Sequence, residues 1–197
     1  MKHTLAFAAF VTVTLLFAQN ALAKQLSAQP FICLNAPDNN SLAEFRNKQK
    51  KFPLYVKLQD AYLDLGGAIF SHFDPVPSSE AIFSMDVTPT ATSDNLRVQL
   101  SVTWTAADGS GGSGLFPNLP TSITSIPNSQ DKHYVFDLTH FQYSDRPVVI
   151  TGIYVSAAGN LGPSTPASDI FFNNFVWNGV TAKHDVAQAP CVNNESP

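Results

Sequence analysis

The chain has 197 residues, with 11 Lys and Arg against 15 Asp and Glu, and its formal net charge is -4. This mildly acidic balance argues against binding to nucleic acid or to anionic membranes, because both need clustered Lys and Arg. The one cationic cluster lies within residues 46–51, and we interpret it as a solvated surface. The length suffices for a single domain with a sizeable core.

The first 23 residues have the pattern of an export signal. Lys2 and His3 form a short basic start, residues 5–17 are an almost unbroken apolar run, and residues 21–23 read Ala-Leu-Ala, the small-residue site of signal peptidase. The run is shorter than the roughly 20 residues of a membrane span, so cleavage is favoured over a retained anchor. We therefore expect a signal peptide at 1–23 and one secreted or periplasmic domain at 24–197, with no membrane span after cleavage.

The two cysteines, Cys33 and Cys191, lie near the two ends of the mature chain. In an oxidising compartment, two thiols and no others predict one disulfide. A redox or metal pair is disfavoured because the C-x-x-C spacing is absent. Asn39 and Asn194 each begin an Asn-x-Ser sequon, which matters only if the host is eukaryotic, and the leader is compatible with both eukaryotic and bacterial export.

A period of two dominates the pattern along the chain. Residues 95–105 place Leu96, Val98 and Leu100 on one face, with polar residues between them, which predicts a half-buried antiparallel strand. Strands are also expected at 31–34, 54–58, 68–73, 81–87, 133–138, 147–156 and 170–177. The single expected helix is short, at 41–51, where Ser41 and Glu44 form a capping-box pattern. These elements predict an all-β fold, an antiparallel β-sandwich of jelly-roll type.

Two segments are rich in glycine and proline. Residues 106–120 contain four glycines, and because no Lys followed by Ser or Thr accompanies them, we interpret the segment as a flexible surface crossing and not as a phosphate loop. Residues 157–168 are expected to join the last two strong strands. Loops at the ends of a sandwich commonly shape binding sites.

The order of motifs over residues 95–177 resembles a known family. A Tyr-Val-Phe-Asp-Leu strand at 134–138, a strand at 149–154 followed by a glycine loop, and the final strand at 171–176 are similar to the C-terminal half of galactose-binding-like jelly-roll carbohydrate-binding modules. The resemblance implies binding to carbohydrate without catalysis. Asn173 stands where many members carry the Asp that helps bind a structural calcium, so this departure argues against calcium, and no other cofactor is expected.

Sugars are held by aromatic rings together with planar polar groups. The candidate ligand-binding residues, on the resemblance, are Trp177, Tyr154, Tyr143, Asn173, Asn174 and Arg146. Each has an alternative role, because Trp177 shares its strand face with apolar residues and Arg146 has the setting of a surface turn. Asn173 and Asn174 point to opposite faces of a regular strand, so only one of them can face a site. Trp104 is expected to pack in the core.

The sequence contains no catalytic signature. Glu occurs only at 44, 80 and 195, neither G-x-S-x-G nor H-E-x-x-H is present, and the histidines are scattered. A metal pair of His133 and His140 is possible in principle, but ordinary surface histidines are favoured; a Ser with His140 and an Asp stays open as a triad. The leading hypothesis is a secreted, non-catalytic protein that binds a glycan or cell-surface ligand. The alternatives are a structural or interaction protein of the envelope or matrix, and a small secreted hydrolase.

Overall fold

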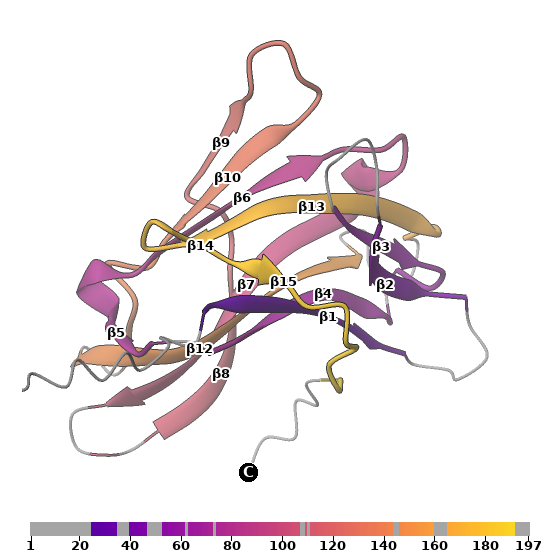
Figure 1. Ribbon diagram of the computed structural model, residues 1–197. Coiled ribbons are helices and arrows are strands. Elements are labelled where there is room, and N and C mark those ends of the chain that lie inside the picture. The colour runs from indigo at the N-terminus through magenta and orange to yellow at the C-terminus, as the bar shows by residue number, and fades with distance from the viewer. Residues whose placement is uncertain are drawn as a thin grey trace, which may run out of the picture.

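A computed structural model describes residues 25–34, 40–46, 53–61, 63–72, 74–106, 109, 111–143, 146–159 and 165–191, with the backbone alone described at 111–118, 143 and 146. The predicted leader and the two sequon asparagines, Asn39 and Asn194, lie outside these residues. Two β-sheets make up the described structure, with only two short 3-10 turns, η1 (Ser78–Glu80) and η2 (Ser93–Asn95) (Figure 1). The predicted all-β sandwich is confirmed.

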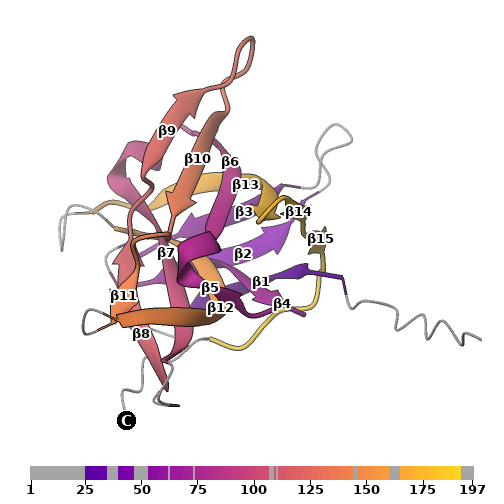
Figure 2. The same cartoon turned by 90° about the vertical axis from the view of Figure 1, so that its left-hand side faces the viewer.

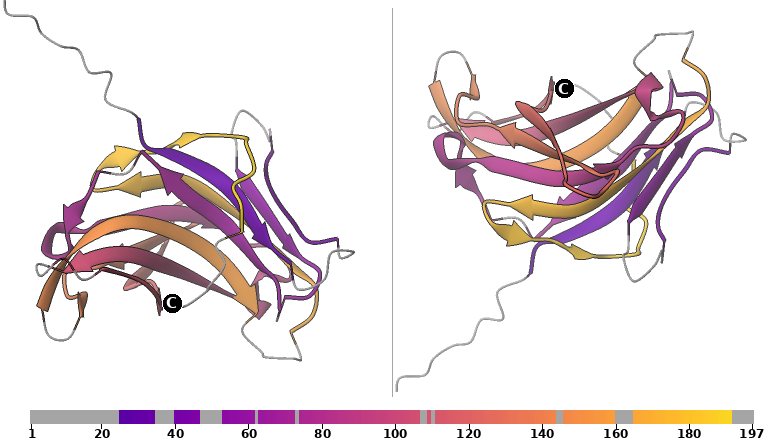
Figure 3. Two further views of the ribbon diagram at one scale, coloured as in Figure 1. Left: turned by 90° about the horizontal axis from the view of Figure 1, so that it is seen from below. Right: turned by 90° about the horizontal axis from the view of Figure 1, so that it is seen from above.

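The first sheet, here called the β12 sheet, is built around the longest strand. Its order is β15 (Lys183–His184), β1 (Ser27–Cys33), β4 (Leu65–Ser71), β12 (Arg146–Gly159), β7 (Leu96–Ala106) and β8 (Gly111–Asn118). The short strands β5 (Val76–Pro77) and β11 (Gln142–Tyr143) also pair with β12. In the left view of Figure 3, the orange strand β12 arches across this layer.

The second sheet, here called the β13 sheet, packs against the first. Its order is β2 (Leu42–Phe45), β3 (Leu54–Leu58), β13 (Ser168–Trp177), β6 (Ile82–Thr88), β10 (Lys132–Asp137) and β9 (Ser122–Ser125), and β14 (Val180–Thr181) pairs with β13. The named strands pair in antiparallel fashion except for β1 with β15. Hairpin β9–β10 extends beyond the body of the sandwich (Figures 1 and 2).

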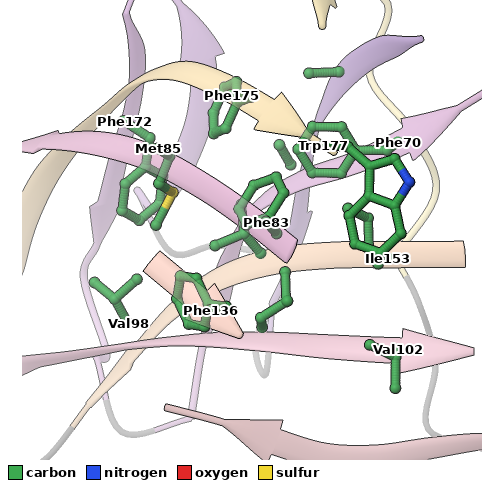
Figure 4. Close-up of a cluster of buried hydrophobic side chains, with 14 of the residues drawn as sticks. Phe70, Phe83, Met85, Val98, Val102, Phe136, Ile153, Phe172, Phe175 and Trp177 are labelled. Carbon is green, nitrogen blue, oxygen red and sulfur yellow. The ribbon is translucent and has the colours of Figure 1, made fainter. Parts of the chain in front are cut away.

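The core lies between the sheets and is rich in aromatic rings. Phe70, Phe83 and Phe175 make edge or stacked contacts with centroid separations of 5.3 to 6.5 Å. Figure 4 shows these rings beside Trp177 and Ile153, all of them buried. The alternating pattern of strands such as β7 produces this interior, because their apolar residues face the opposite sheet. Trp104 is buried in the same core, as predicted.

Strand β7 departs from the prediction on its polar face. The sequence places Gln99 and Ser101 on a solvated side, yet their relative exposures are 9% and 0%. The reason is a second, smaller apolar cluster on the outer side of the β12 sheet, formed by Phe31, Tyr154 and Ala189. Tyr154 pairs directly with Ser101 across β12 and β7. The middle of β7 is therefore covered on both faces.

Two predicted elements are wrong. The part of the expected 41–51 helix that is described forms strand β2, because Leu42–Phe45 pairs with β3 and the Ser41 hydroxyl accepts a hydrogen bond from the Gln59 backbone instead of capping a helix. The glycine-rich segment expected to be a flexible crossing forms strand β8, paired along β7. Pairing of backbone groups needs no side chain, so glycines do not prevent it.

The predicted disulfide is present. Cys33 at the end of β1 is bonded to Cys191, with the two Cα atoms 5.0 Å apart and a sequence separation of 158. The same end of the chain is held by the parallel pairing of β15 with β1 and by a bridge between Phe31 and Ala189. No helix among the described residues has the length and apolar character needed to cross a membrane.

Candidate functional site

A groove with a volume of about 470 Å³ opens between the sheets, where β7 of one sheet faces β9 and β10 of the other. We call it the Tyr134 groove. Eight of its thirteen lining residues are apolar: Val87, Pro89, Leu96, Val98, Leu119, Pro120, Ile123 and Ile170. The other five are Ser93, Asp94, Arg97, Lys132 and Tyr134. An apolar floor with a few polar groups, at this volume, is the usual composition of a small-molecule pocket.

Tyr134 forms one wall of the groove. It lies on β10 between Met85 of β6 and Ile123 of β9, which are its partners in register. Tyr134 shares a strand face with Phe136, and whereas Phe136 is fully buried between the sheets, Tyr134 is half-buried. Tyr134 lies nearer than Phe136 to the tip of the β9–β10 hairpin, which extends past the body of the sandwich (Figure 2), and it faces the groove opposite the start of β7.

The opposite wall comes from the start of β7 and the turn before it. Leu96 and Val98 face inward and are buried, and they form the floor. The 3-10 turn η2 places Ser93 and Asp94 at the rim; it is held by a hydrogen bond from the Thr90 backbone N–H to the Ser93 hydroxyl. Leu119, in the crossover from β8 to β9, closes one end and is 56% exposed.

The polar residues of the groove include a neutral tyrosine, two cations and one anion. Burial raises the pKa of the Tyr134 hydroxyl above its ordinary value, and the negative charge of Asp94 raises it further, so this hydroxyl stays protonated and can donate a hydrogen bond. Arg97 and Lys132 are exposed, and neither forms an ion pair with a residue that the structure describes. The lining thus carries two cations and one anion.

A second polar cluster lies on the outer face of the β13 sheet. Asp86 accepts a hydrogen bond from the Asn174 amide at 2.5 Å and lies 2.8 Å from Nδ1 of His133. Asn174 has a positive φ of 49° at the bulge where β13 shifts register against β6. No Ser or Thr hydroxyl is hydrogen-bonded to His133 among the described residues, so this His–Asp pair there lacks the nucleophile of a hydrolytic triad.

A third cluster, here called the Tyr55 face, lies on the outer side of the same sheet. The Arg46 guanidinium is 3.7 Å from the centroid of the Tyr55 ring, and the Phe171 ring lies beside Tyr55 with a centroid separation of 4.8 Å and a tilt of 38°. The Tyr55 hydroxyl donates to Asp169 at 3.0 Å. Burial would raise the pKa of the Asp169 carboxyl, but hydrogen bonds from surrounding hydroxyls, first those of Thr90 and Thr92, lower it overall.

The residues predicted from the sequence to bind ligand are not brought together at one site. Trp177 and Tyr154 are 4% and 5% exposed, so their rings present no open face (Figure 4 shows Trp177). Asn173 is buried whereas Asn174 is exposed and bonded to Asp86. Tyr143 and Arg146 face each other in the pairing of β11 with β12, and their side chains lie outside the described residues.

Sequence reasoning missed Tyr134. The residue lies two positions before Phe136, so a strand of period two places both on one face and predicts that both pack in the core. The one signal available was its hydroxyl, because a buried Tyr needs a polar partner. Within the described part of the chain, no group of three or more His, Cys, Asp and Glu side chains is placed to hold a metal ion, and His133 and His140 form no such site.

No protein-family model matches this chain, and neither does any curated protein or solved structure.

Proposed function

We propose that this protein is an exported, non-catalytic binding protein and that its ligand lies in the Tyr134 groove. The observation that supports this most is the composition of the groove: a concave apolar floor between two sheets, with a protonated Tyr134 hydroxyl and three charged side chains at its rim. Such a site orients a ligand through its few polar groups and gains affinity from the apolar area that the ligand covers.

Export is the second part of this proposal. It is supported by the basic-apolar-small pattern of residues 1–23 and by the bond between Cys33 and Cys191, since disulfides persist in oxidising compartments.

The absence of a catalytic role is supported by the chemistry of the groove. Tyr134 is held protonated, and Asp94 is the one carboxylate in the lining, so a paired acid and base is not assembled there.

The test uses a neutral apolar dye, Nile red, whose fluorescence rises on transfer from water. The purified protein should bind it with a 1:1 stoichiometry. Ile123→Glu places a charge on the apolar rim and should weaken binding about tenfold or more, because burying an unpaired carboxylate is costly. Val180→Glu is the matched control, since both side chains are 52% exposed and Val180 lies on β14, outside the groove. Equal binding by the two variants would refute the groove as the site.

Carbohydrate binding is a second candidate, and the Tyr55 face favours it. Tyr55, Arg46 and Asp169 combine an aromatic ring, a planar guanidinium and a carboxylate on a sheet surface. Because Arg46 covers one face of the Tyr55 ring, a sugar would be held there mainly by hydrogen bonds to the guanidinium and the carboxylate. This proposal keeps the class of ligand implied by the resemblance to carbohydrate-binding modules while moving the site away from Trp177 and Tyr154.

A glycan array separates the two candidate sites. If the Tyr55 face binds sugar, Tyr55→Ala should abolish the array signal and Tyr134→Ala should leave it unchanged. The reverse pattern would place sugar in the groove instead, and no signal with the unsubstituted protein would refute carbohydrate binding.

A further inference from the structure

We propose that the ligand of the Tyr134 groove is an anionic amphipathic molecule, with an apolar chain on the floor and a carboxylate held at the rim by Arg97 and Lys132. This inference rests on the proposed function of the groove and names the chemical class of its ligand.

The lining of the groove contains more cationic than anionic residues. The whole chain is acidic, with a formal net charge of -4, yet the groove lining carries two cations against the single carboxylate of Asp94. Arg97 and Lys132 come from different sheets, on β7 and β10, and both line the same groove. Lys132 shares the inner strand face of Tyr134, whereas Arg97, which alternates with the inward-facing Leu96 and Val98, lines the groove at the edge of β7 that β8 leaves unpaired. An anion at the mouth of the groove would lie between these two residues.

These two cations, Arg97 and Lys132, make no ion pair with the residues that the structure describes. Arg46, in contrast, lies 2.6 Å from a carboxylate oxygen of Glu44 and covers the Tyr55 ring. An arginine without a carboxylate partner keeps its planar donors available for a bidentate bond to a ligand carboxylate.

The apolar part of the groove indicates the chemistry of the rest of the ligand. Leu119 and Ile123 are more than half exposed, and they lie beside a floor that includes the buried Val98. A sugar would leave this apolar surface against hydroxyl groups, whereas a hydrocarbon chain would cover it and remove it from water. The volume of about 470 Å³ is within the range of pockets that hold small molecules.

Asp94 and Tyr134 determine where in the groove a ligand carboxylate would lie. The Asp94 carboxylate lies close enough to Tyr134 to raise the pKa of its hydroxyl, and like charges repel. A ligand carboxylate is therefore directed away from Asp94 and toward the two cations, while the Tyr134 hydroxyl remains a donor for it. The groove distinguishes an acid from the alcohol of equal chain length by these groups.

The experiment compares decanoate with decanol, measured by displacement of bound Nile red. Decanoate should bind more tightly than decanol at pH 7, and added salt should reduce the difference. The double variant Arg97→Gln with Lys132→Gln should weaken decanoate binding about tenfold or more and leave decanol unchanged, since a charge-assisted pair accounts for about one power of ten or more in affinity. Lys183→Gln, an exposed lysine on β15 outside the groove, is the matched control.

The outcomes separate the two proposals. If both compounds displace the dye equally and the double variant changes neither, the groove is a binding site but the anionic class is refuted. If the dye binds and Ile123→Glu does not weaken it, the groove itself is refuted, and the ligand class with it. Tighter binding of decanoate that is lost in the double variant and kept in Lys183→Gln supports the inference.

Discussion

Removing the disulfide between Cys33 and Cys191 should destabilise the protein strongly. The bond closes a loop of 158 residues. In the chain-entropy model, opening a loop of that length adds conformational entropy to the unfolded chain and lowers its free energy by about 5 kcal/mol at 25 °C. A typical domain is stable by only about 5–15 kcal/mol. The double substitution to Ser should therefore remove a large part of the total stability while the strand pairing of β1 with β15 remains.

The assay is equilibrium unfolding in urea, followed by Trp fluorescence, since Trp104 and Trp177 are both buried. The midpoint should fall sharply for the double variant. The dependence on urea should become steeper, because an unfolded chain without the cross-link exposes more surface. A loss of less than about 1 kcal/mol, with no change in slope, would refute the reasoning that the bond acts by constraining the unfolded chain.

Three further perturbations test the core, the sheet and the pH response. Phe83→Ala, at a fully buried ring, should cost about 3–5 kcal/mol in urea unfolding, and a cost below about 1 kcal/mol would contradict its place in the core. Gly67→Ala should cost about 3 kcal/mol because a Cβ there meets the Val155 carbonyl oxygen, whereas Gly66→Ala meets side-chain ends and should cost less; a reversed order in thermal unfolding would contradict the close approach of β4 and β12. The pKa of Asp169 is lowered in the folded state, so its contribution to stability is present above the unfolded value, near 4, and is lost as the pH falls through the folded value. Asp169→Asn should flatten the dependence of stability on pH below about pH 4, and an unchanged acid unfolding curve would contradict the shift.

The strands could be predicted because burial of one face imposes a period of two on the sequence. The segment 54–58 has the bounds of β3, and 95–105 differs from β7 by one residue at each end. Length was the main error, as in β1, which begins at Ser27 and not at residue 31. Ser27, Gln29 and Pro30 carry no apolar alternation, and they are in a strand because β4 pairs with all of them.

The two wrongly predicted elements form strands because they pair with strands outside their own local sequence. The capping-box pattern at Ser41 is a local signal, and pairing of Leu42–Phe45 with β3 overrides it. Strand β8 has few residues of high strand propensity and forms because β7 supplies the hydrogen-bonding edge. A single sequence does not contain these pairings in any local pattern.

The candidate site was harder to predict than the fold. Aromatic residues were selected from the sequence because they bind sugars, yet the same property makes Trp177 and Tyr154 effective core residues, and both are buried. The groove lies where the β9–β10 hairpin faces the start of β7, and the strand pattern of Tyr134 is the same whether its face is covered or open.

The most direct test of the account maps decanoate binding by backbone amide chemical shifts in a ¹H-¹⁵N NMR titration. Saturable shifts are expected to cluster at residues of both walls of the groove: Leu96, Arg97, Ile123, Lys132 and Tyr134. Shifts confined to the Tyr55 face, or no saturable shifts at millimolar decanoate, would contradict the claim that this protein binds an anionic amphipathic ligand between the two sheets.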